Sequence, residues 1–258
     1  MIKQQNFKSI HEFYNYITTR ETNQIFAHRS LESKEGTYSF TETHSFEGAS
    51  GLLLNGWESK AKEIEKALYV RVKSMAAAPK QKSEYSVVGG QASVARYLQG
   101  IPTNMINRKS VPQKQKVITL TKSVSYSGFV ATETIFENSL AALQMIKAIE
   151  DSGTRVNLNI VLGTQVSREK AQVKIRIKSA GERMNISKLA FPLVHPSMLR
   201  RLMFKYLEVT DLITSREFAF GYGSPIEDNN VVLEKGELLI PKYFKESEIA
   251  AYIKNNLK

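Results

Sequence analysis

The chain has 258 residues, with 36 Lys and Arg against 25 Asp and Glu, so its formal net charge is +11. It contains no cysteine, which excludes disulfides, a thiolate nucleophile and Cys-ligated zinc or iron–sulfur sites. No run of 18 apolar residues occurs, and the polar amino end lacks the apolar core of a signal peptide, so we expect a soluble cytoplasmic protein without a membrane partner.

The first predicted element is a helix from Ser9 to about Thr19. Ser9 is suited to cap its start, and Glu12 occupies the capping-box position three residues later. One face of this helix is apolar and is expected to dock on a larger structure. That face comprises Ile10, Phe13, Tyr14 and Ile17.

Residues 38–83 are predicted to form a short strand, two helices and a linker. The alternation of residues 38–43 is typical of a strand. Two helical stretches between Phe46 and Ser74 are separated near Gly56-Trp57, and the second, Glu58 to Lys73, is amphipathic with a basic exterior. The linker candidate is residues 75–83, MAAAPKQKS.

From residue 116 onward, strand and helix patterns alternate. A strand at 117–125 is followed by a helix at 133–150 and a strand at 155–162. A helix of that length between two strands predicts a parallel pair, whereas the turn of about eight residues before Ala171 predicts an antiparallel hairpin. The remaining predicted elements are a strand at 171–177, a helix at 198–207, a strand at 231–240 and a helix at 247–256 capped by Ser247.

These patterns predict an α/β fold. Its centre is a Rossmann-like, mostly parallel sheet with one antiparallel strand, accompanied by an α-rich amino-terminal region. In this division, residues 1–115 form the α-rich region packed on the core and residues 116–258 form the α/β domain.

The connectivity of residues 116–178 resembles that of von Willebrand factor A domains. In that family the first strand ends in D-x-S-x-S, whose aspartate and serines hold a divalent cation at the carboxyl edge of the sheet. Here the matching residues are Thr121, Ser123 and Ser125, so the charged ligand is missing. Neutral hydroxyls alone compensate poorly for the dehydration of a divalent cation. We interpret the pattern as a degenerate metal site whose hydroxyls cap the sheet edge, with metal binding as the alternative.

Several short motifs resemble, in order and spacing, a family of uncharacterised proteins carried mainly by phages and related mobile elements. The resemblance covers most of the chain and implies a von Willebrand A-like core, a viral context, and a location in the host-cell cytoplasm or with the virion. It implies no catalytic mechanism. The motifs are Gly56-Trp57, Gly89-Gly90, Val94 to Pro102 with Asn104-Met105, Leu189 to Phe191, and His195 to Arg201.

No group of residues has the spacing of a catalytic site. His195 could act as an acid or base beside Arg200 and Arg201, or it could cap the following helix through a backbone hydrogen bond. The four histidines lack an HExxH spacing, and Gly89-Gly90 lacks the lysine and hydroxyl of a phosphate-binding loop. We therefore expect binding rather than catalysis, and no cofactor.

Two segments concentrate positive charge. Residues 60–114 carry 11 Lys and Arg against 3 acidic residues, and residues 168–216 carry 11 against 4. If both segments lie on one face, they predict a nucleic-acid interface that contacts phosphates; otherwise the charge serves solubility. The candidate contacts are Lys80, Lys82, Arg96, Arg108, Lys109, Arg200 and Arg201.

The function that these observations favour is that of a phage-encoded accessory or assembly protein. It is expected to bind nucleic acid or an oligomeric partner, self-association included. Two alternatives stay open, a structural virion component and a metal-assisted nuclease. Salt-dependent retention on DNA or RNA distinguishes the favoured function from a virion component, and magnesium-dependent cleavage identifies a nuclease.

The T-x-S-x-S pattern generates a first test. Calorimetric titration with magnesium and manganese is expected to show no stoichiometric binding, because Thr121 stands where the family has its charged ligand. Thr121→Asp restores the carboxylate and is expected to gain weak affinity. Stoichiometric binding by the unaltered protein that Ser123→Ala abolishes would contradict this interpretation.

Overall fold

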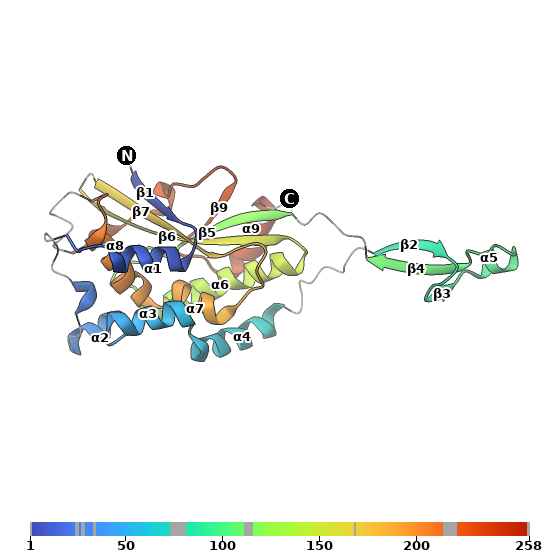
Figure 1. The fold of residues 1–258 in the computed structure, drawn as a ribbon, viewed down its shortest axis with the longest axis horizontal. Coiled ribbons are helices and arrows are strands. Elements are labelled where there is room, and N and C mark those ends of the chain that lie inside the picture. Colours follow the sequence, from blue (N-terminus) through green and yellow to red (C-terminus); the bar gives the residue numbers. More distant parts are fainter. Residues whose placement is uncertain are drawn as a thin grey trace.

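The computed structural model describes residues 2–23, 26, 29–32, 35–72, 81–110, 116–167, 169–213 and 221–256. These residues form a body built on a central sheet with helices, and a small second sheet that projects from it (Figure 1). The predicted α/β class, with a mostly parallel sheet and an antiparallel strand, is confirmed.

The central sheet contains six described strands: β1 (Ile2–Phe7), β5 (Val117–Ser123), β6 (Arg155–Val166), β7 (Glu169–Lys178), β8 (Ser224–Pro225) and β9 (Glu237–Ile240). Their order is β1-β7-β6-β5-β9, and β8 pairs with β6. β5 lies parallel to β6 and to β9, and β1 lies parallel to β7. β7 and β8 each run antiparallel to β6.

A long helix accounts for the parallel pairing of β5 and β6. This helix, α6 (Thr132–Asp151), returns the chain to the start of β6, so that Val117 lies opposite Arg155. Every residue from Asn138 to Ile146 is buried, so the middle of α6 is enclosed by the sheet and by neighbouring helices. The predicted order of strand, crossover helix and strand is therefore confirmed.

A hairpin extends the sheet beyond β6. Ser167, with a φ of 50°, lies in the turn between β6 and β7, and the two strands pair antiparallel as predicted. β1 then pairs with β7 along its whole length, from Ile2 opposite Lys170 to Phe7 opposite Ile175. The sequence analysis does not predict β1, so two long strands rather than one run opposite to β5, β6 and β9.

Helices cover one face of the sheet (Figure 1). Phe191 is fully buried in this layer, and Trp57 is partly buried against the core. No described helix is both long and apolar enough to cross a bilayer. The layer contains α1 (Ile10–Thr19), α3 (Phe46–Asn55), α4 (Glu58–Val72), α6, α7 (Ile186–Val194), a π-helical stretch (Met198–Met203) and α8 (Phe204–Val209).

The Gly56-Trp57 motif joins α3 and α4 to α7. The Trp57 N–H donates to the carbonyl of Ser187 at 2.9 Å. Gly56 has a φ of 95°, and a Cβ there would lie 2.4 Å from Ser187 Oγ. Glycine is therefore required where these helices meet, both by the backbone conformation and by the close approach.

The opposite face of the sheet is polar and is covered by carboxyl-terminal residues. Asn159 on β6 donates to Glu237 Oε1 at 3.0 Å, and Lys174 on β7 pairs with Glu237 Oε2 at 2.6 Å. Gln172 exchanges two hydrogen bonds of 2.9 Å with the backbone of Val232. Each polar side chain buried here has a partner on another segment, as a buried polar surface requires.

One local prediction is wrong, and two are confirmed only in part. Residues 38–43, predicted as a strand, lie in and just after α2 (Glu35–Thr41), where the Glu42 N–H bonds the Tyr38 carbonyl at 2.7 Å as in a helix. The strand predicted at 231–240 is confined to β9. The last helix, α9 (Ile249–Asn256), follows a 3₁₀ turn at Glu246–Glu248 instead of starting at a Ser247 cap.

Residues 81–110 form a three-stranded sheet of their own, which we call the arm (Figure 1). β2 (Gln81–Ser86) pairs antiparallel with β4 (Met105–Ser110), β3 (Gln91–Ala92) pairs with the start of β4, and α5 (Val94–Leu98) lies at the far end. At Gly89 the chain passes close to β4, because a Cβ there would lie 2.5 Å from the Ile106 carbonyl oxygen. Gly89-Gly90 thus serves the arm's own packing.

The amino-terminal residues contribute to the sheet as well as to the helical layer. β1 forms one edge of the sheet, while α1, α3 and α4 pack beneath it. The predicted division into residues 1–115 and 116–258 stays a prediction. The sheet nevertheless contains strands from both sides of residue 115, since β1 pairs with β7.

The burial of Phe191 generates a stability test. Phe191→Ala is expected to lower the free energy of unfolding by about 3–5 kcal/mol, the usual cost of removing an aromatic ring from a packed core. Phe129, which is 102% exposed, supplies the matched control, and Phe129→Ala is expected to change stability by less than about 0.5 kcal/mol. Denaturant unfolding measures both. Equal effects of the two substitutions would refute the core assignment.

Candidate nucleic-acid interface and sheet-edge site

The carboxyl ends of three parallel strands define the first candidate site. β5, β6 and β9 run in the same direction, so the residues after them gather at one edge, where open α/β sheets bind ligands. A hollow of about 260 Å³, the sheet-edge hollow, lies here. Its lining includes Ser127 to Phe129 after β5, Thr164 of β6, and Tyr222 to Pro225.

The T-x-S-x-S residues lie at the end of β5 and are fully buried. Thr121 Oγ1 accepts a hydrogen bond from Asn159 Nδ2 at 3.3 Å, and Ser125 Oγ accepts one from the Gly163 N–H at 2.7 Å. Ser123 Oγ has no hydrogen-bond partner among the described residues. Two of these three hydroxyls therefore tie β5 to β6.

These residues do not fit a divalent cation. All three oxygens are neutral, and two of them already accept protein hydrogen bonds. Within the described ranges, no three His, Asp or Glu side chains are grouped closely enough to hold a metal ion. The geometry thus assigns no metal-dependent step to the end of β5.

Lys122 is a buried amine at the same end of β5. Its Nζ donates to the carbonyl oxygens of Lys242, at 2.8 Å, and of Pro241. Burial lowers the pKa of Lys122 from 10.5 to about 7, and nearby Asp228 opposes this shift. The lysine therefore links β5 to the segment after β9.

The sheet-edge hollow has little chemistry of its own. Thr164 Oγ1 donates to the Tyr222 carbonyl at 2.5 Å, and the Tyr222 hydroxyl donates to buried Glu208 at 2.6 Å. Tyr222 also stacks on Phe204, with ring centroids 4.0 Å apart. The polar groups named here bond one another, so the hollow contains no evident pairing of a nucleophile with a base.

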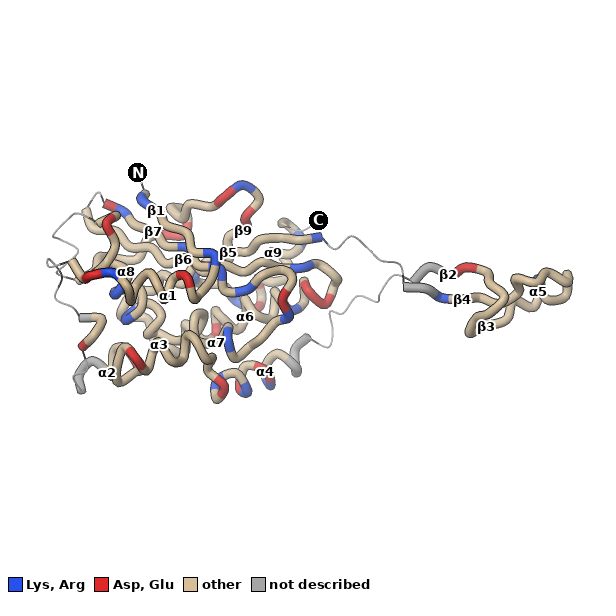
Figure 2. Tube along the Cα trace, viewed as in Figure 1, with Lys and Arg blue, Asp and Glu red and all other residues tan. Residues whose placement is uncertain are grey.

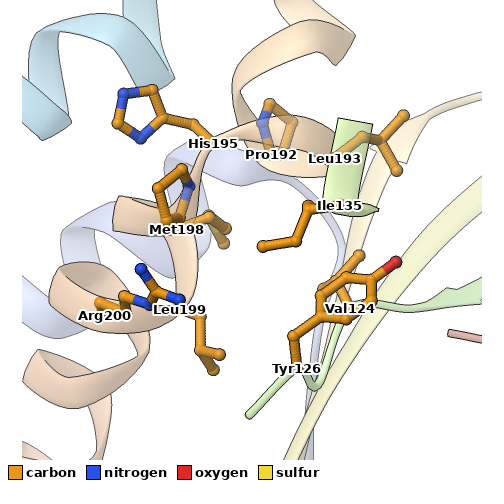
Figure 3. Close-up of a pocket in the computed structure, with 10 residues that line it drawn as sticks. Val124, Tyr126, Ile135, Pro192, Leu193, His195, Met198, Leu199 and Arg200 are labelled. Carbon is orange, nitrogen blue, oxygen red and sulfur yellow. The ribbon is translucent and has the colours of Figure 1, made fainter. Parts of the chain in front are cut away.

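His195 packs in the helical layer rather than in an open site. Its Nδ1 accepts a hydrogen bond from the Ser197 N–H at 3.1 Å, and its ring lies 4.8 Å from that of Trp57. In Figure 3 the imidazole points away from Ile135 and Tyr126. Burial lowers the pKa of His195 to about 4, so the ring is neutral at pH 7 and acts as the helix cap that the sequence analysis kept as an alternative.

Arg200 and Arg201 do not offer their charges to a polyanion, which corrects their predicted role. Both side chains are buried. Arg200 donates to the carbonyls of Phe40 at 2.6 Å and Gly128 at 3.0 Å, and Arg201 donates to those of Ser30, Glu32 and Thr43 at 2.8–3.1 Å. Desolvation lowers the pKa of both guanidinium groups. Their hydrogen bonds join helices and loops inside the protein.

The other candidate cations belong to the arm and its connection. Arg108 is exposed on β4, whereas Arg96 lies 4.1 Å over the ring of Tyr85 and donates to Thr103 at 3.2 Å. The register of β2 and β4 sets Lys82 opposite Lys109. Lys80 lies outside the described residues. The arm therefore brings three of the predicted residues together near its base, while Arg96 lies in α5 at the far end.

A second groove gathers cations that the sequence analysis did not single out. This basic groove, of about 380 Å³, lies between the start of α1, the end of β7 and the start of α7. Glu182 is the one acidic residue in its described lining. Its cationic residues are Lys8, Arg176, Lys178, Arg183 and Lys188.

The cations of the basic groove differ in availability. Lys178 Nζ pairs with Glu150 at 2.6 Å, and Arg176 Nε donates to Asn159 at 2.5 Å. Lys8, Arg183 and Lys188 are exposed. Figure 2 shows Lys and Arg around the start of α1 and beside α7. Two cations of the lining are thus engaged within the protein, and three exposed ones are available to an anion.

Sequence reasoning located the basic segment but not the groove. Arg176, Arg183 and Lys188 all fall in the basic segment 168–216, whereas Lys8 lies more than a hundred residues earlier. Only the parallel pairing of β1 with β7 brings the start of α1 to the end of β7. The groove could therefore have been predicted only by recognising the strand β1 in the sequence.

Comparison with known proteins places the chain in a family. A family model described as "Domain of unknown function (DUF7192)" matches residues 2–258. The chain belongs to this family. No curated protein and no solved structure shows significant similarity to it. The DUF7192 description names no activity, so the function of this member is argued from its own residues.

The buried amine of Lys122 generates a pH test. Because its folded pKa of about 7 lies below its ordinary value of 10.5, the unfolded chain binds more protons between these values. The lysine's contribution to the unfolding free energy therefore rises with pH in that window, by up to about 1.4 kcal/mol per pH unit. Lys122→Met is expected to remove this rise.

Urea unfolding of both proteins at about pH 7.5 and 9.5 measures the difference. All other titrating groups are common to the two proteins and cancel. Stability curves that stay parallel across this window would show that Lys122 keeps its charge in the folded protein.

Proposed function

We propose that this protein is a non-catalytic nucleic-acid-binding protein, and that the basic groove contacts the phosphate backbone. The observation that carries the proposal is the convergence of Lys8, Arg183 and Lys188, which are exposed and share one groove. Two acidic residues lie near them: Glu182, whose carboxylate accepts the Ser179 N–H at 2.9 Å, and Glu12, whose carboxylate accepts the Lys8 N–H at 2.6 Å. Cations that outnumber the nearby acids favour a polyanion.

The start of α1 borders the basic groove. Ser9, Ile10 and His11 line it, but Ser9 and Glu12 already cap the amino end of α1, so its partial positive charge is largely offset. The groove is open and about 380 Å³ in volume, large enough to admit a phosphate and its sugar. Contacts of this kind position a nucleic acid without reading its sequence.

The arm is proposed as a second contact. Residues 73–116, which include the arm and its connections, carry eight Lys and Arg against one Glu, a net +7 of the chain's +11. Arg108 is exposed at its base, and the two strands set Lys82 opposite Lys109. The arm also exposes Tyr85 and Tyr97 as stacking surfaces.

The finer family and fold assignments are part of this proposal. The order β5, α6 and β6, with hydroxyl residues at the end of β5, supports a von Willebrand A-like core with a degenerate metal site. The motif resemblance supports a phage-encoded accessory or assembly protein in the host cytoplasm or with the virion. A structural virion component and a metal-assisted nuclease remain the alternatives, the second disfavoured by the neutral donor set of Thr121, Ser123 and Ser125.

The basic groove generates a binding test. Arg183→Ala combined with Lys188→Ala is expected to weaken binding to random duplex DNA and to single strands alike. Each lost phosphate contact should reduce the log–log salt slope by about one, so the double variant should lose about two. Fluorescence anisotropy at two salt concentrations measures this. A strong preference for one sequence would contradict backbone-only binding.

The matched control removes the same charge from another surface. Lys62 and Lys66 are exposed on α4, so Lys62→Ala combined with Lys66→Ala should leave the salt slope nearly unchanged. Lys80→Ala with Lys82→Ala then asks whether the arm contributes. Equal losses of affinity and salt slope in the groove and control variants would show that binding depends only on the net charge. An absence of binding at low salt would overturn the proposal.

A further inference from the structure

The sheet-edge hollow is lined mainly by aromatic and small residues. It lies outside the carboxyl ends of β5 and β6, where open α/β sheets bind ligands. Its volume of about 260 Å³ is just below the range of about 300–1,000 Å³ that is usual for ligands of drug size, so it is large enough to admit a single ring system. The aromatic residues of its described lining are Phe40, Tyr126, Phe129, Phe204 and Tyr222.

Two of these aromatic rings are open to a ligand. Phe204 and Tyr222 stack on each other with centroids 4.0 Å apart, and Phe40 lies nearly parallel to Phe204 at 6.4 Å. Phe40 is nevertheless 37% exposed, and Phe129 is 102% exposed. The faces of aromatic side chains bind flat rings by stacking, so Phe40 and Phe129 provide stacking surfaces at one hollow.

Arg200 fixes the two open rings in place. Phe40 belongs to α2 and Phe129 to the segment after β5, so the two are distant in the sequence. The Arg200 guanidinium donates to the carbonyl of Phe40 at 2.6 Å and to those of Gly128 and Val130 at 3.0 and 3.2 Å. The backbone on both sides of Phe129 is thus held before a ligand arrives, which lowers the entropic cost of binding.

The charge of the hollow restricts the ligand. Arg200 is the single charged residue in the described lining, and its guanidinium lies 4.6 Å from the centroid of the Phe40 ring. A cationic ligand would be repelled and would find no carboxylate in this lining. Because Arg200 is satisfied by carbonyl groups, the ligand needs no negative charge either.

Two hydroxyl groups in the lining of the hollow are available for hydrogen bonds. The Ser127 hydroxyl accepts only a long contact of 3.5 Å from the Phe129 N–H and donates to none of the described residues. The Ser224 hydroxyl makes no hydrogen bond within the described part of the chain. Each hydroxyl both donates and accepts, so together they suit a ring with nitrogen or oxygen atoms on its edge.

We infer that the sheet-edge hollow binds an uncharged heteroaromatic ring of nucleobase size. The ring stacks on Phe129 and Phe40, and its edge exchanges hydrogen bonds with the hydroxyls of Ser127 and Ser224. Two sources offer this chemistry, a free nucleoside and an unpaired base within a strand. The inference does not rest on the proposed phosphate contact, because the sheet-edge hollow and the basic groove share no lining residue.

Titration with adenosine, guanosine, cytidine and uridine tests the inference. These probes carry no phosphate, so they do not report on the basic groove. At least one is expected to bind with a Kd of about 1 mM or tighter, as a ligand of this size allows. Amide NMR signals should shift at residues 127–129 and 221–224. No shift with any of the four at about 1 mM, or shifts confined to other regions, would overturn the inference.

Substitution of Phe129 separates stacking from simple apolar contact. Phe129→Leu keeps an apolar side chain but loses the flat face, and it is expected to weaken nucleoside binding at least about fivefold. Phe129→Trp keeps the flat face and is expected to bind at least as tightly as the unaltered protein. An unchanged Kd for Phe129→Leu would contradict a stacked ring.

A second substitution and a control complete the set of variants. Ser127→Ala is expected to weaken binding about two- to tenfold, the usual effect of losing one hydrogen bond. Val117→Ala removes apolar surface at the opposite end of β5, where the side chain is 54% exposed, and should leave the Kd unchanged. All these positions are outside the core, so thermal unfolding midpoints should match that of the unaltered protein. An equal loss of affinity in Val117→Ala would refute the assignment to the hollow.

Competition with strands identifies the source of the ring. At about 0.5 M salt, which screens phosphate contacts, a short single strand and an abasic strand of the same length compete with the bound nucleoside. Displacement only by the strand with bases supports the inference and assigns the hollow to an unpaired base. No displacement by either strand supports a free nucleoside as the ligand. Equal displacement by the abasic strand would overturn the inference, because the competition would then not require a base.

The failure of this inference is distinguishable from the failure of the proposed function. A protein that binds DNA through the basic groove but binds none of the four nucleosides keeps the proposed function and loses the ring site. A protein that binds a nucleoside in the sheet-edge hollow but does not bind DNA at low salt keeps the ring site and loses the proposed function.

Discussion

The attachment of the amino-terminal segments to the carboxyl-terminal helices depends on a buried cation and a buried anion that meet at Ser30. The Ser30 carbonyl accepts a hydrogen bond from Arg201 at 3.1 Å, while its N–H and hydroxyl donate to Glu208 at 3.0 and 2.5 Å. Burying either charge is costly unless it is fully hydrogen-bonded, so both must be satisfied together. Arg201 also donates hydrogen bonds to the hydroxyl and the carbonyl of Thr43, and Arg200 donates to the carbonyls of Phe40 and Gly128. The π-helical stretch at 198–203 presents these two adjacent arginines to different loops.

This use of charge inside the protein determines where charge is available outside it. Arginines committed to carbonyl groups cannot neutralise phosphates, so a basic segment of the sequence need not be a basic surface. Exposed charge gathers in several places, among them the cations of the basic groove, Arg108 at the base of the arm, and a groove along α6 that is lined by Glu63, Glu133 and Glu137. A protein of net charge +11 with an acidic groove has surfaces that attract different partners.

The parts of the fold that could be predicted from the sequence are those with a regular spacing of apolar residues and clear signals at their ends. α1, α6 and the hairpin of β6 and β7 follow from apolar spacing, caps and turn length. β1 was not predicted because four of its six residues are polar and its partner strand, β7, lies more than 160 residues away in the sequence. The basic groove was not predicted either, since only the pairing of β1 with β7 brings Lys8 to Arg183 and Lys188. The burial of Arg200 and Arg201 had no sequence signal, because the carbonyl groups that surround them belong to segments distant in the chain.

The arm shows why an interaction surface and a stability problem can be the same feature. A small sheet with one apolar face buried is marginal by itself, and the arm buries none of the side chains described between residues 83 and 108. Its ladder of β2 with β4, the close approach at Gly89 and the contact of Arg96 with Tyr85 define its shape but remove little apolar surface from water. The largest further stabilisation open to it is burial of Val94, Tyr97 and Leu98, which its own residues do not supply. Any surface that covers these three side chains would therefore stabilise the fold of the arm by the free energy of that binding.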